Sequence, residues 1–141
     1  MATPANSIKR SYISAPRQKS RSYSPAVITE GGRIVWLTGH LAPEDMDGNS
    51  LEGDFAAQVR CTFAKLEKTL DQAGRSLTDI VTMTVFITDV GNKTSFVELR
   101  KEFFGDDYPA STQVTVAALN RPEQSGKIQT DTKLSQVTTR P

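Results

Sequence analysis

The chain has 141 residues, a length that fits one domain, and its 37% hydrophobic and 23% charged residues are those of an ordinary globular protein. A formal net charge of +1 gives no global attraction to nucleic acid or to anionic membranes, so neither is expected as a partner. The single cysteine, Cys61, excludes an internal disulfide, and the lack of a long apolar run or a signal-peptide core predicts a cytoplasmic protein.

The segment before Glu30, the first acidic residue, is rich in basic and serine side chains. Such a start resembles a mitochondrial transit peptide or a nucleic-acid-binding arm, so a mitochondrial location stays open as an alternative. The apolar residues in residues 8–14 fit a short edge strand at least as well, and we expect one there. Residues 1–7 and 138–141 are expected to be flexible ends of a single domain spanning residues 1–141.

Residues 26–37 have the composition of a β-hairpin. Two runs rich in β-branched residues flank a Gly-Gly pair, and this pair supplies the positive φ angles that a tight hairpin turn needs. Thr38, Gly39 and His40 end the second strand, and a glycine at that point permits close approach of a backbone or a ligand.

Residues 42–53 are polar and predict a loop. Asp54 is a good N-cap for a helix that follows, and Gly74 is the expected stop. The apolar residues of this segment recur at helical spacing and predict one buried face, made of Phe55, Val59, Phe63, Leu66 and Leu70.

Residues 76–119 are the segment around which the rest of the chain is organised. Apolar and polar residues alternate over residues 81–88, which predicts a strand with one buried face. The spacing becomes helical over residues 96–103, Gly105 ends that helix, and a second alternating run follows. A connection this long predicts parallel strands with a right-handed crossover. Any site on this unit is expected at strand ends or at the sheet edge, where residues 108–112 lie.

Residues 127–137 predict a weak, polar last strand. The resulting order is strand, hairpin, helix, strand, helix, strand, strand. This order predicts an α+β fold in which both helices pack on one face of a mixed sheet. The second face would remain uncovered in a monomer, and burial of that face by oligomerisation is the usual solution.

Short motifs spread over nearly the whole chain carry a family resemblance. They are residues 22–25 (Ser-Tyr-Ser-Pro for Pro-Tyr-Ser-Gln), 38–40 (Thr-Gly-His for Ser-Gly-Gln), 54–58 (Asp-x-x-x-Gln), 70–79 (Leu-x-x-Ala-Gly-x-x-Leu-x-Asp) and 109–111 (Pro-Ala-Ser for Pro-Ala-Arg). Each motif is weak alone, but together and in this order they are fairly specific. The chain resembles the RidA/YjgF family of reactive-intermediate deaminases, which also includes the L-PSP endoribonuclease-like proteins.

The resemblance implies a chorismate-mutase-like fold and a homotrimer with ligand clefts between its subunits. Typical members hydrolyse imines and enamines, such as 2-iminopropanoate, to the keto acid and ammonia. They need no metal or organic cofactor, so none is expected here. In these members an arginine after Pro-Ala binds the substrate carboxylate through two parallel hydrogen bonds, and a glutamate on the last strand holds the attacking water.

Transferred position by position, the resemblance places a small-molecule site at Tyr23, Thr38, Gly39, His40, Ser111 and Gln129. Ser111 occupies the position of the arginine, and Gln129 aligns with the glutamate. Activity on 2-iminopropanoate is therefore doubtful. Ser111 is either a ligand contact or an ordinary first residue of a strand. His40 replaces a glutamine and is either a ligand contact that titrates near neutrality or a hydrogen-bonded histidine at a strand end.

These observations favour a trimer that binds a small metabolite in clefts between subunits, with catalytic residues unassigned. A first hypothesis is a divergent imine or enamine deaminase or a related hydrolase. A second is a non-catalytic ligand-binding or regulatory trimer. A third is an RNA-directed activity, which the modest net charge and the absence of a pair of histidines argue against.

Overall fold

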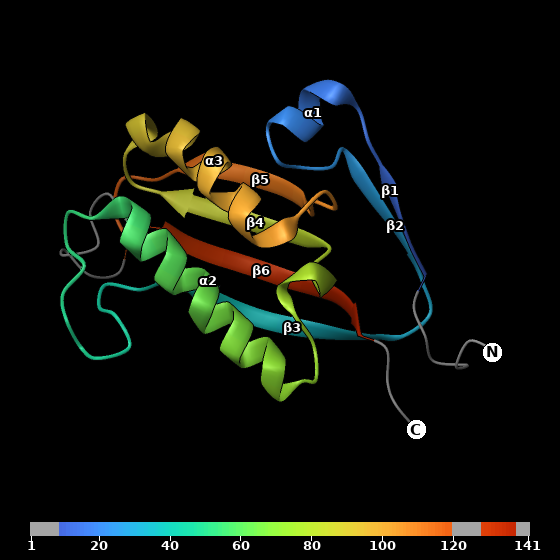
Figure 1. Ribbon diagram of the computed structural model, residues 1–141, viewed down its shortest axis with the longest axis horizontal. Helices are drawn as coiled ribbons and strands as arrows, with labels where there is room; N and C mark the ends of the chain where they lie inside the picture. Colours follow the sequence, from blue (N-terminus) through green and yellow to red (C-terminus); the bar gives the residue numbers. More distant parts are fainter. Residues whose placement is uncertain (1–8, 120–127, 138–141) are drawn as a thin grey trace.

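The structure of the protein, a computed structural model, describes residues 9–119 and 128–137. Its elements in chain order are β1 (Lys9–Ile13), α1 (Pro16–Ser20), β2 (Ala26–Glu30), β3 (Arg33–His40), α2 (Phe55–Gln72), β4 (Thr82–Ile87), α3 (Lys93–Phe104), β5 (Ala110–Thr115) and β6 (Ile128–Val137). Helices α2 and α3 lie on one face of a four-stranded sheet, and β1 and β2 form a separate ribbon at its side (Figure 1). The predicted α+β arrangement is confirmed. The flexibility expected of residues 1–7 and 138–141 concerns segments outside the described residues.

The four-stranded sheet has the order β3-β6-β4-β5 and is mixed. Strands β4 and β5 are parallel, with Thr82 opposite Ala110, and α3 connects them, so the predicted strand–helix–strand unit is confirmed. Strand β6 is antiparallel to both of its neighbours, β3 and β4. The last strand is thus central in the sheet, although its sequence is too polar to indicate a central position.

The hairpin predicted over residues 26–37 is wrong. The chain does bend at Gly31 and Gly32, with φ angles of 74° and 78°. Strand β2, however, pairs with β1 along all five residues, while β3 pairs with β6 in the other sheet. A Gly-Gly pair determines where the chain bends, but the pairing partners of the two strands are decided by residues distant in sequence. The predicted edge strand over residues 8–14 is confirmed as β1.

A short helix, α1, lies between β1 and β2 and was not expected from the sequence. Its signal is Pro16 at the first helical position, where the missing N–H costs nothing and the fixed φ favours a helix. The backbone N–H groups of Arg21, Ser22 and Tyr23 donate to carbonyl groups of this helix. The helix therefore sets the path of the segment over residues 21–25.

The hydrophobic core lies between the sheet and the two long helices. The predicted stripe of α2 meets the alternating residues of β4 and the apolar face of α3 in one cluster. Phe63 is at its centre and is 1% exposed. Its ring contacts those of Phe96, Phe103 and Phe104, with centroid distances of 6.3, 4.5 and 5.7 Å. The predicted limits of α2 are also confirmed. At its start Asp54 accepts a hydrogen bond from the Ala57 N–H at 3.0 Å, and after its end Gly74 has a φ of 71°.

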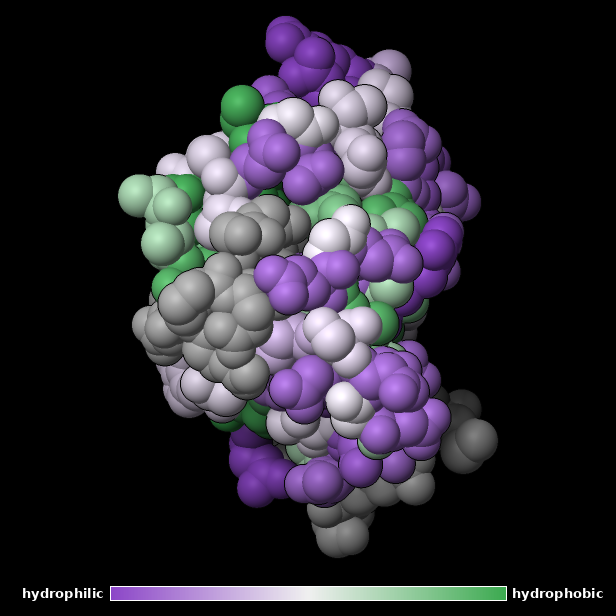
Figure 2. All heavy atoms as spheres, turned by 90° about the vertical axis from the view of Figure 1, so that its left-hand side faces the viewer, coloured by the Kyte–Doolittle hydropathy of each residue, from purple (hydrophilic) through white to green (hydrophobic). Residues whose placement is uncertain are grey.

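The other face of the sheet carries apolar side chains without helix cover. Ile34 and Trp36 alternate with core-packed residues of β3, and Val114 pairs with Phe86 of β4. Trp36 is 68% exposed. By contrast, the end of the molecule seen in Figure 2 is largely covered by hydrophilic side chains, with hydrophobic ones in smaller patches between them. No helix within the described residues is long and apolar enough to cross a membrane.

Candidate functional site

Two of the sequence motifs are held together by Ser24. Its backbone N–H donates to the Pro109 carbonyl oxygen at 3.1 Å, and its hydroxyl donates to the Tyr108 carbonyl oxygen at 2.5 Å. Ser24 is buried, so these bonds are shielded from water. They place the segment containing Tyr23 beside the start of β5, where Ser111 lies. Residues far apart in sequence thus meet at the edge of the sheet.

A pocket of about 210 Å³ lies at this edge. It is lined by Arg21, Tyr23, Lys93, Val97, Arg100, Ser111 and Gln113. Of the residues predicted from the sequence, Tyr23 and Ser111 are brought together here. The lining includes basic residues and no acidic one, so the pocket is electropositive.

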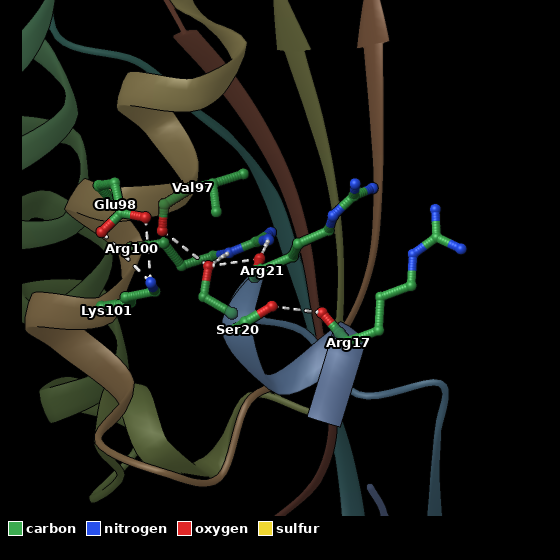
Figure 3. A network of polar contacts seen from close by, with 8 residues as sticks. Arg17, Ser20, Arg21, Val97, Glu98, Arg100 and Lys101 are labelled. Atoms are coloured by element: carbon green, nitrogen blue, oxygen red, sulfur yellow. Dashed lines mark hydrogen bonds and ion pairs between the residues drawn. The ribbon is translucent and has the colours of Figure 1, made fainter. Parts of the chain in front are cut away.

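Arg100 connects the helix to both motifs. It lies four residues after Phe96 and four before Phe104, so α3 directs it toward the core with the two rings. Its guanidinium donates from Nη1 to Ser111 Oγ at 2.6 Å and from Nη2 to the Arg21 carbonyl oxygen at 3.0 Å. In Figure 3 the Arg100 side chain points toward that carbonyl group, while the Arg21 side chain extends away from it. The guanidinium also lies over the Phe96 ring, 5.1 Å from its centroid.

The charge of Arg100 is buried without an acidic partner among the described residues. The residue is only 3% exposed, and its hydrogen-bond acceptors are neutral. Burial lowers the pKa of Arg100 to about 10, and the phenols of Tyr108 and Tyr23 offset part of this effect. Below about pH 10, where Arg100 is charged, this lowered pKa corresponds to a loss of about 3 kcal/mol of folding stability. The loss disappears as the pH rises further, because the folded protein gives up the proton before the unfolded chain does.

Ser22 also holds the guanidinium, through a nitrogen other than the one that contacts Ser111. Its hydroxyl accepts from Arg100 Nε at 3.1 Å and lies 2.7 Å from the Val97 carbonyl oxygen, to which it can donate. Ser22 is fully buried and has a φ of 59°, in the left-handed region that residues other than glycine rarely adopt. Such strain persists where the surroundings fix the conformation, and it occurs preferentially at binding sites.

Two further donors belong to the pocket. Ser111 Oγ accepts a hydrogen bond from Arg100, which leaves its own O–H available to donate. Gln113 follows two residues later on the same face of β5, and its side-chain Nε2 is buried without a hydrogen-bond partner among the described residues. A buried donor without a partner is costly, so an acceptor entering the pocket would relieve that cost.

The other predicted site residues lie elsewhere in the subunit. Thr38, Gly39 and His40 end β3, which is at the opposite edge of the sheet from β5. The ring of His40 is hydrogen-bonded within the fold, by Nδ1 to the Thr38 carbonyl oxygen at 2.9 Å and by Nε2 to Thr69 Oγ1 at 3.0 Å. These bonds agree with the interpretation of His40 as a hydrogen-bonded histidine at a strand end.

Gln129 is placed only by its backbone, in β6 opposite Phe86 of β4. The predicted site residues therefore form two groups on opposite sheet edges, with Gln129 on the strand between β3 and β4. Among the described residues no cluster of side chains has the composition of a metal site. A single subunit thus brings together only the part of the predicted site that contains Tyr23 and Ser111.

Sequence reasoning missed Arg100, Ser22 and Gln113. The signal for Arg100 is a basic residue at a core-facing position of an amphipathic helix, where a charge is rarely buried unless it is paired. Gln113 had a similar signal, since it follows Ser111 by two residues and must share its face of the strand. Nothing in the sequence marks Ser22 as a residue with a positive φ.

The fold and the pocket define an α+β domain with a small electropositive pocket at the edge of its sheet. The family model described as Endoribonuclease L-PSP matches residues 13–130. The chain belongs to this family, which is the RidA/YjgF family, and it has the fold of that family.

Related proteins and structures agree with this assignment. The chain is 32% identical to the protein mmf2, mitochondrial, of Schizosaccharomyces pombe over 107 residues, which are 76% of this chain and 82% of the relative. It is 27% identical to the human 2-iminobutanoate/2-iminopropanoate deaminase over 97 residues, 69% of each chain. RidA from an Antarctic Psychrobacter superposes with a TM-score of 0.65 at 30% identity, covering 81% of this chain and 88% of the other. The Rid-family protein YyfB of Yersinia pestis has a similar fold, with a TM-score of 0.77 at 22% identity over 91% of this chain and 98% of the other.

Proposed function

We propose that this protein binds a small metabolite in the pocket at the edge of β5 and hydrolyses it as a divergent imine or enamine deaminase. The observation that carries the proposal is the meeting of Tyr23 and Ser111 in one electropositive pocket. Relatives named 2-iminobutanoate/2-iminopropanoate deaminase support the reaction class. In that reaction water adds to the C=N bond, ammonia leaves, and a carbonyl group remains.

The protein contributes binding and orientation to this chemistry. An imine has one atom that attracts a proton and one carbon that water attacks, so hydrogen-bond donors and a held water are sufficient aids. The Tyr23 phenol lies close enough to Arg100 to affect its pKa, and it is the donor that we assign to the reacting end of the ligand. Residues 38–40 would complete the site from the β3 edge of a neighbouring subunit. The compartment remains a proposal, with the cytoplasm preferred and the mitochondrion as the alternative.

A turnover assay tests the hydrolase. Imines would be generated from amino acids by an amino-acid oxidase, and release of ammonia and keto acid would be compared with the uncatalysed rate. We expect catalysis above the uncatalysed rate. Tyr23→Phe should reduce the catalysed rate about two- to tenfold, because the transition state loses one hydrogen bond. Tyr12→Phe is the matched control, because Tyr12 lies in β1, outside this pocket.

The outcomes of that assay separate the hypotheses. Turnover that is sensitive to Tyr23 and not to Tyr12 supports the deaminase. Saturable binding of the keto acid without turnover supports the non-catalytic ligand-binding trimer, which Ser111 in the position of the family's arginine favours. Neither binding nor turnover with any small imine or keto acid would contradict both proposals.

The trimer is proposed from the two separated groups of site residues and from the uncovered face of the sheet. Light scattering should give three times the mass of one chain. Trp36→Glu should shift the protein toward monomers, because it places a charge in an apolar interface. Met46→Glu is the control, since Met46 is 54% exposed on the loop between β3 and α2, outside the sheet strands. A wild-type monomer at micromolar concentration would contradict the trimer.

A further inference from the structure

The pocket contains a buried cation whose counter-charge is not supplied by the described residues. A guanidinium has five N–H groups, of which Arg100 directs three to Ser22, Ser111 and the Arg21 carbonyl oxygen. A further contact joins Nη1 to Met83 Sδ at 4.0 Å, the long limit for a bond to sulfur. One N–H on Nη2 is left without an acceptor among the described residues, and all these partners are neutral.

Three unused donors therefore belong to residues that line one small space. They are the remaining N–H of Arg100 Nη2, the hydroxyl hydrogen of Ser111 and the amide of Gln113, whose Nε2 is buried without a partner. Arg100, Ser111 and Gln113 all line the pocket of about 210 Å³. Donors that are grouped around a buried positive charge match a ligand with several acceptor oxygens and a negative charge.

We propose that Arg100, acting with Ser111 and Gln113, is the binding site for the carboxylate of a small monoanionic ligand. Resting on the proposed function, this assigns to α3 the guanidinium that the family's Pro-Ala-Arg motif carries on the strand. Ser111 then positions Arg100 and adds a donor of its own. The ligand is a carboxylate in preference to a phosphate because one buried cation is matched by one negative charge, while Arg21 and Lys93 are exposed to solvent.

The test uses binding, independently of turnover. Acetate, pyruvate, 2-oxobutanoate and benzoate are titrated into the purified protein by NMR at millimolar concentration, with pyruvamide as the uncharged analogue of pyruvate. We expect at least one carboxylate to bind and pyruvamide to bind weakly. Arg100→Met should weaken carboxylate binding roughly 10- to 100-fold, because the ligand loses a hydrogen bond to a charged group. Binding of pyruvamide should change little.

Matched variants separate a local effect from a loss of fold. Lys101→Met removes the same charge from the next position of α3, where Lys101 pairs with Glu98 at 3.0 Å on the surface, and it should leave binding unchanged. Arg100→Met should fold, because it removes the cost of an uncompensated buried charge, although Ser22, Ser111 and the Arg21 carbonyl oxygen each lose a hydrogen-bond donor. If circular dichroism shows that it does not, Ser111→Ala and Gln113→Leu keep the guanidinium and should each weaken carboxylate binding about three- to tenfold.

Several results would overturn the inference. These are no binding of any of the four carboxylates, equal binding of pyruvate and pyruvamide, tighter binding of inorganic phosphate than of every carboxylate, or folded pocket variants with unchanged carboxylate affinity. Carboxylate binding that depends on Arg100, in a protein without deaminase turnover, would support this inference and contradict the hydrolase. Turnover that is indifferent to Arg100 would support the hydrolase and contradict this inference.

Discussion

Combining Arg100→Met with Ser111→Arg moves the guanidinium from α3 to β5. The double variant should restore the carboxylate binding and stability that the single substitutions impair. Ser111→Arg alone places a second cation beside Arg100, and two unit charges about 4 Å apart near a protein surface repel by roughly 4 kcal/mol. We expect this variant to lose much of its folding stability. Arg100→Met alone removes the charge and should weaken binding of 2-oxobutanoate roughly 10- to 100-fold. The double variant has one guanidinium again, on the strand, and should bind within about tenfold of wild type.

The measurement is a double-mutant cycle on both binding and unfolding. Calorimetric titration gives the affinity for 2-oxobutanoate, and urea denaturation gives the free energy of unfolding. The control is Ser111→Arg combined with Lys101→Met, which has the same net charge but leaves two guanidinium groups in the pocket, and it should behave as Ser111→Arg. Additive effects of Arg100→Met and Ser111→Arg would show that the two positions do not share one site.

Truncation of Phe63 should produce the largest loss of stability in the core. The side chain is 1% exposed and contacts three other phenylalanine rings, so Phe63→Ala removes a large buried surface and leaves a cavity between α2 and α3. The expected decrease in the free energy of unfolding is about 3–5 kcal/mol. Urea denaturation measures it.

The control for this substitution is Met46→Ala on the exposed loop, which should change the free energy of unfolding by less than about 0.5 kcal/mol. A loss of less than about 1 kcal/mol for Phe63→Ala would mean that the core between the helices collapses around the cavity or is packed differently. The affinity for carboxylates is a second readout. It should decrease little in the fraction that remains folded, since Phe63 is not among the residues that line the pocket.

The parts of the fold that could be predicted are those determined by local periodicity. Helix α2, strand β4 and helix α3 each bury one regular stripe, and Asp54 and Gly105 mark their ends by capping chemistry. Strand pairing was not predictable in the same way. The residues of β2 and β3 are compatible with a hairpin, and only contacts with β1 and β6 decide against it.

The part of the candidate site that lies in the sequence motifs was predictable. Tyr23 and Ser111 were identified by position, and the structure brings them into one pocket. Arg100 was missed because motif comparison assigns a chemical group to one position, whereas a guanidinium on a long side chain can reach the same point from another element. The place of residues 38–40 at the far edge of the sheet also depends on the strand order, which no local pattern encodes.

The central place of β6 has a consequence for the time at which the protein can fold. Strands β3 and β4 are not neighbours of each other and meet only through β6, which ends at Val137. During synthesis β3, which is complete at His40, therefore stays without its sheet partner until residues 128–137 have left the ribosome, while β4 has only β5 beside it. Pairings between residues so distant in sequence form slowly, because a long loop must close first. The growing chain thus exposes the unpaired edges of β3, and later one edge of β4, until β6 emerges, and this is the interval in which it most needs protection from aggregation.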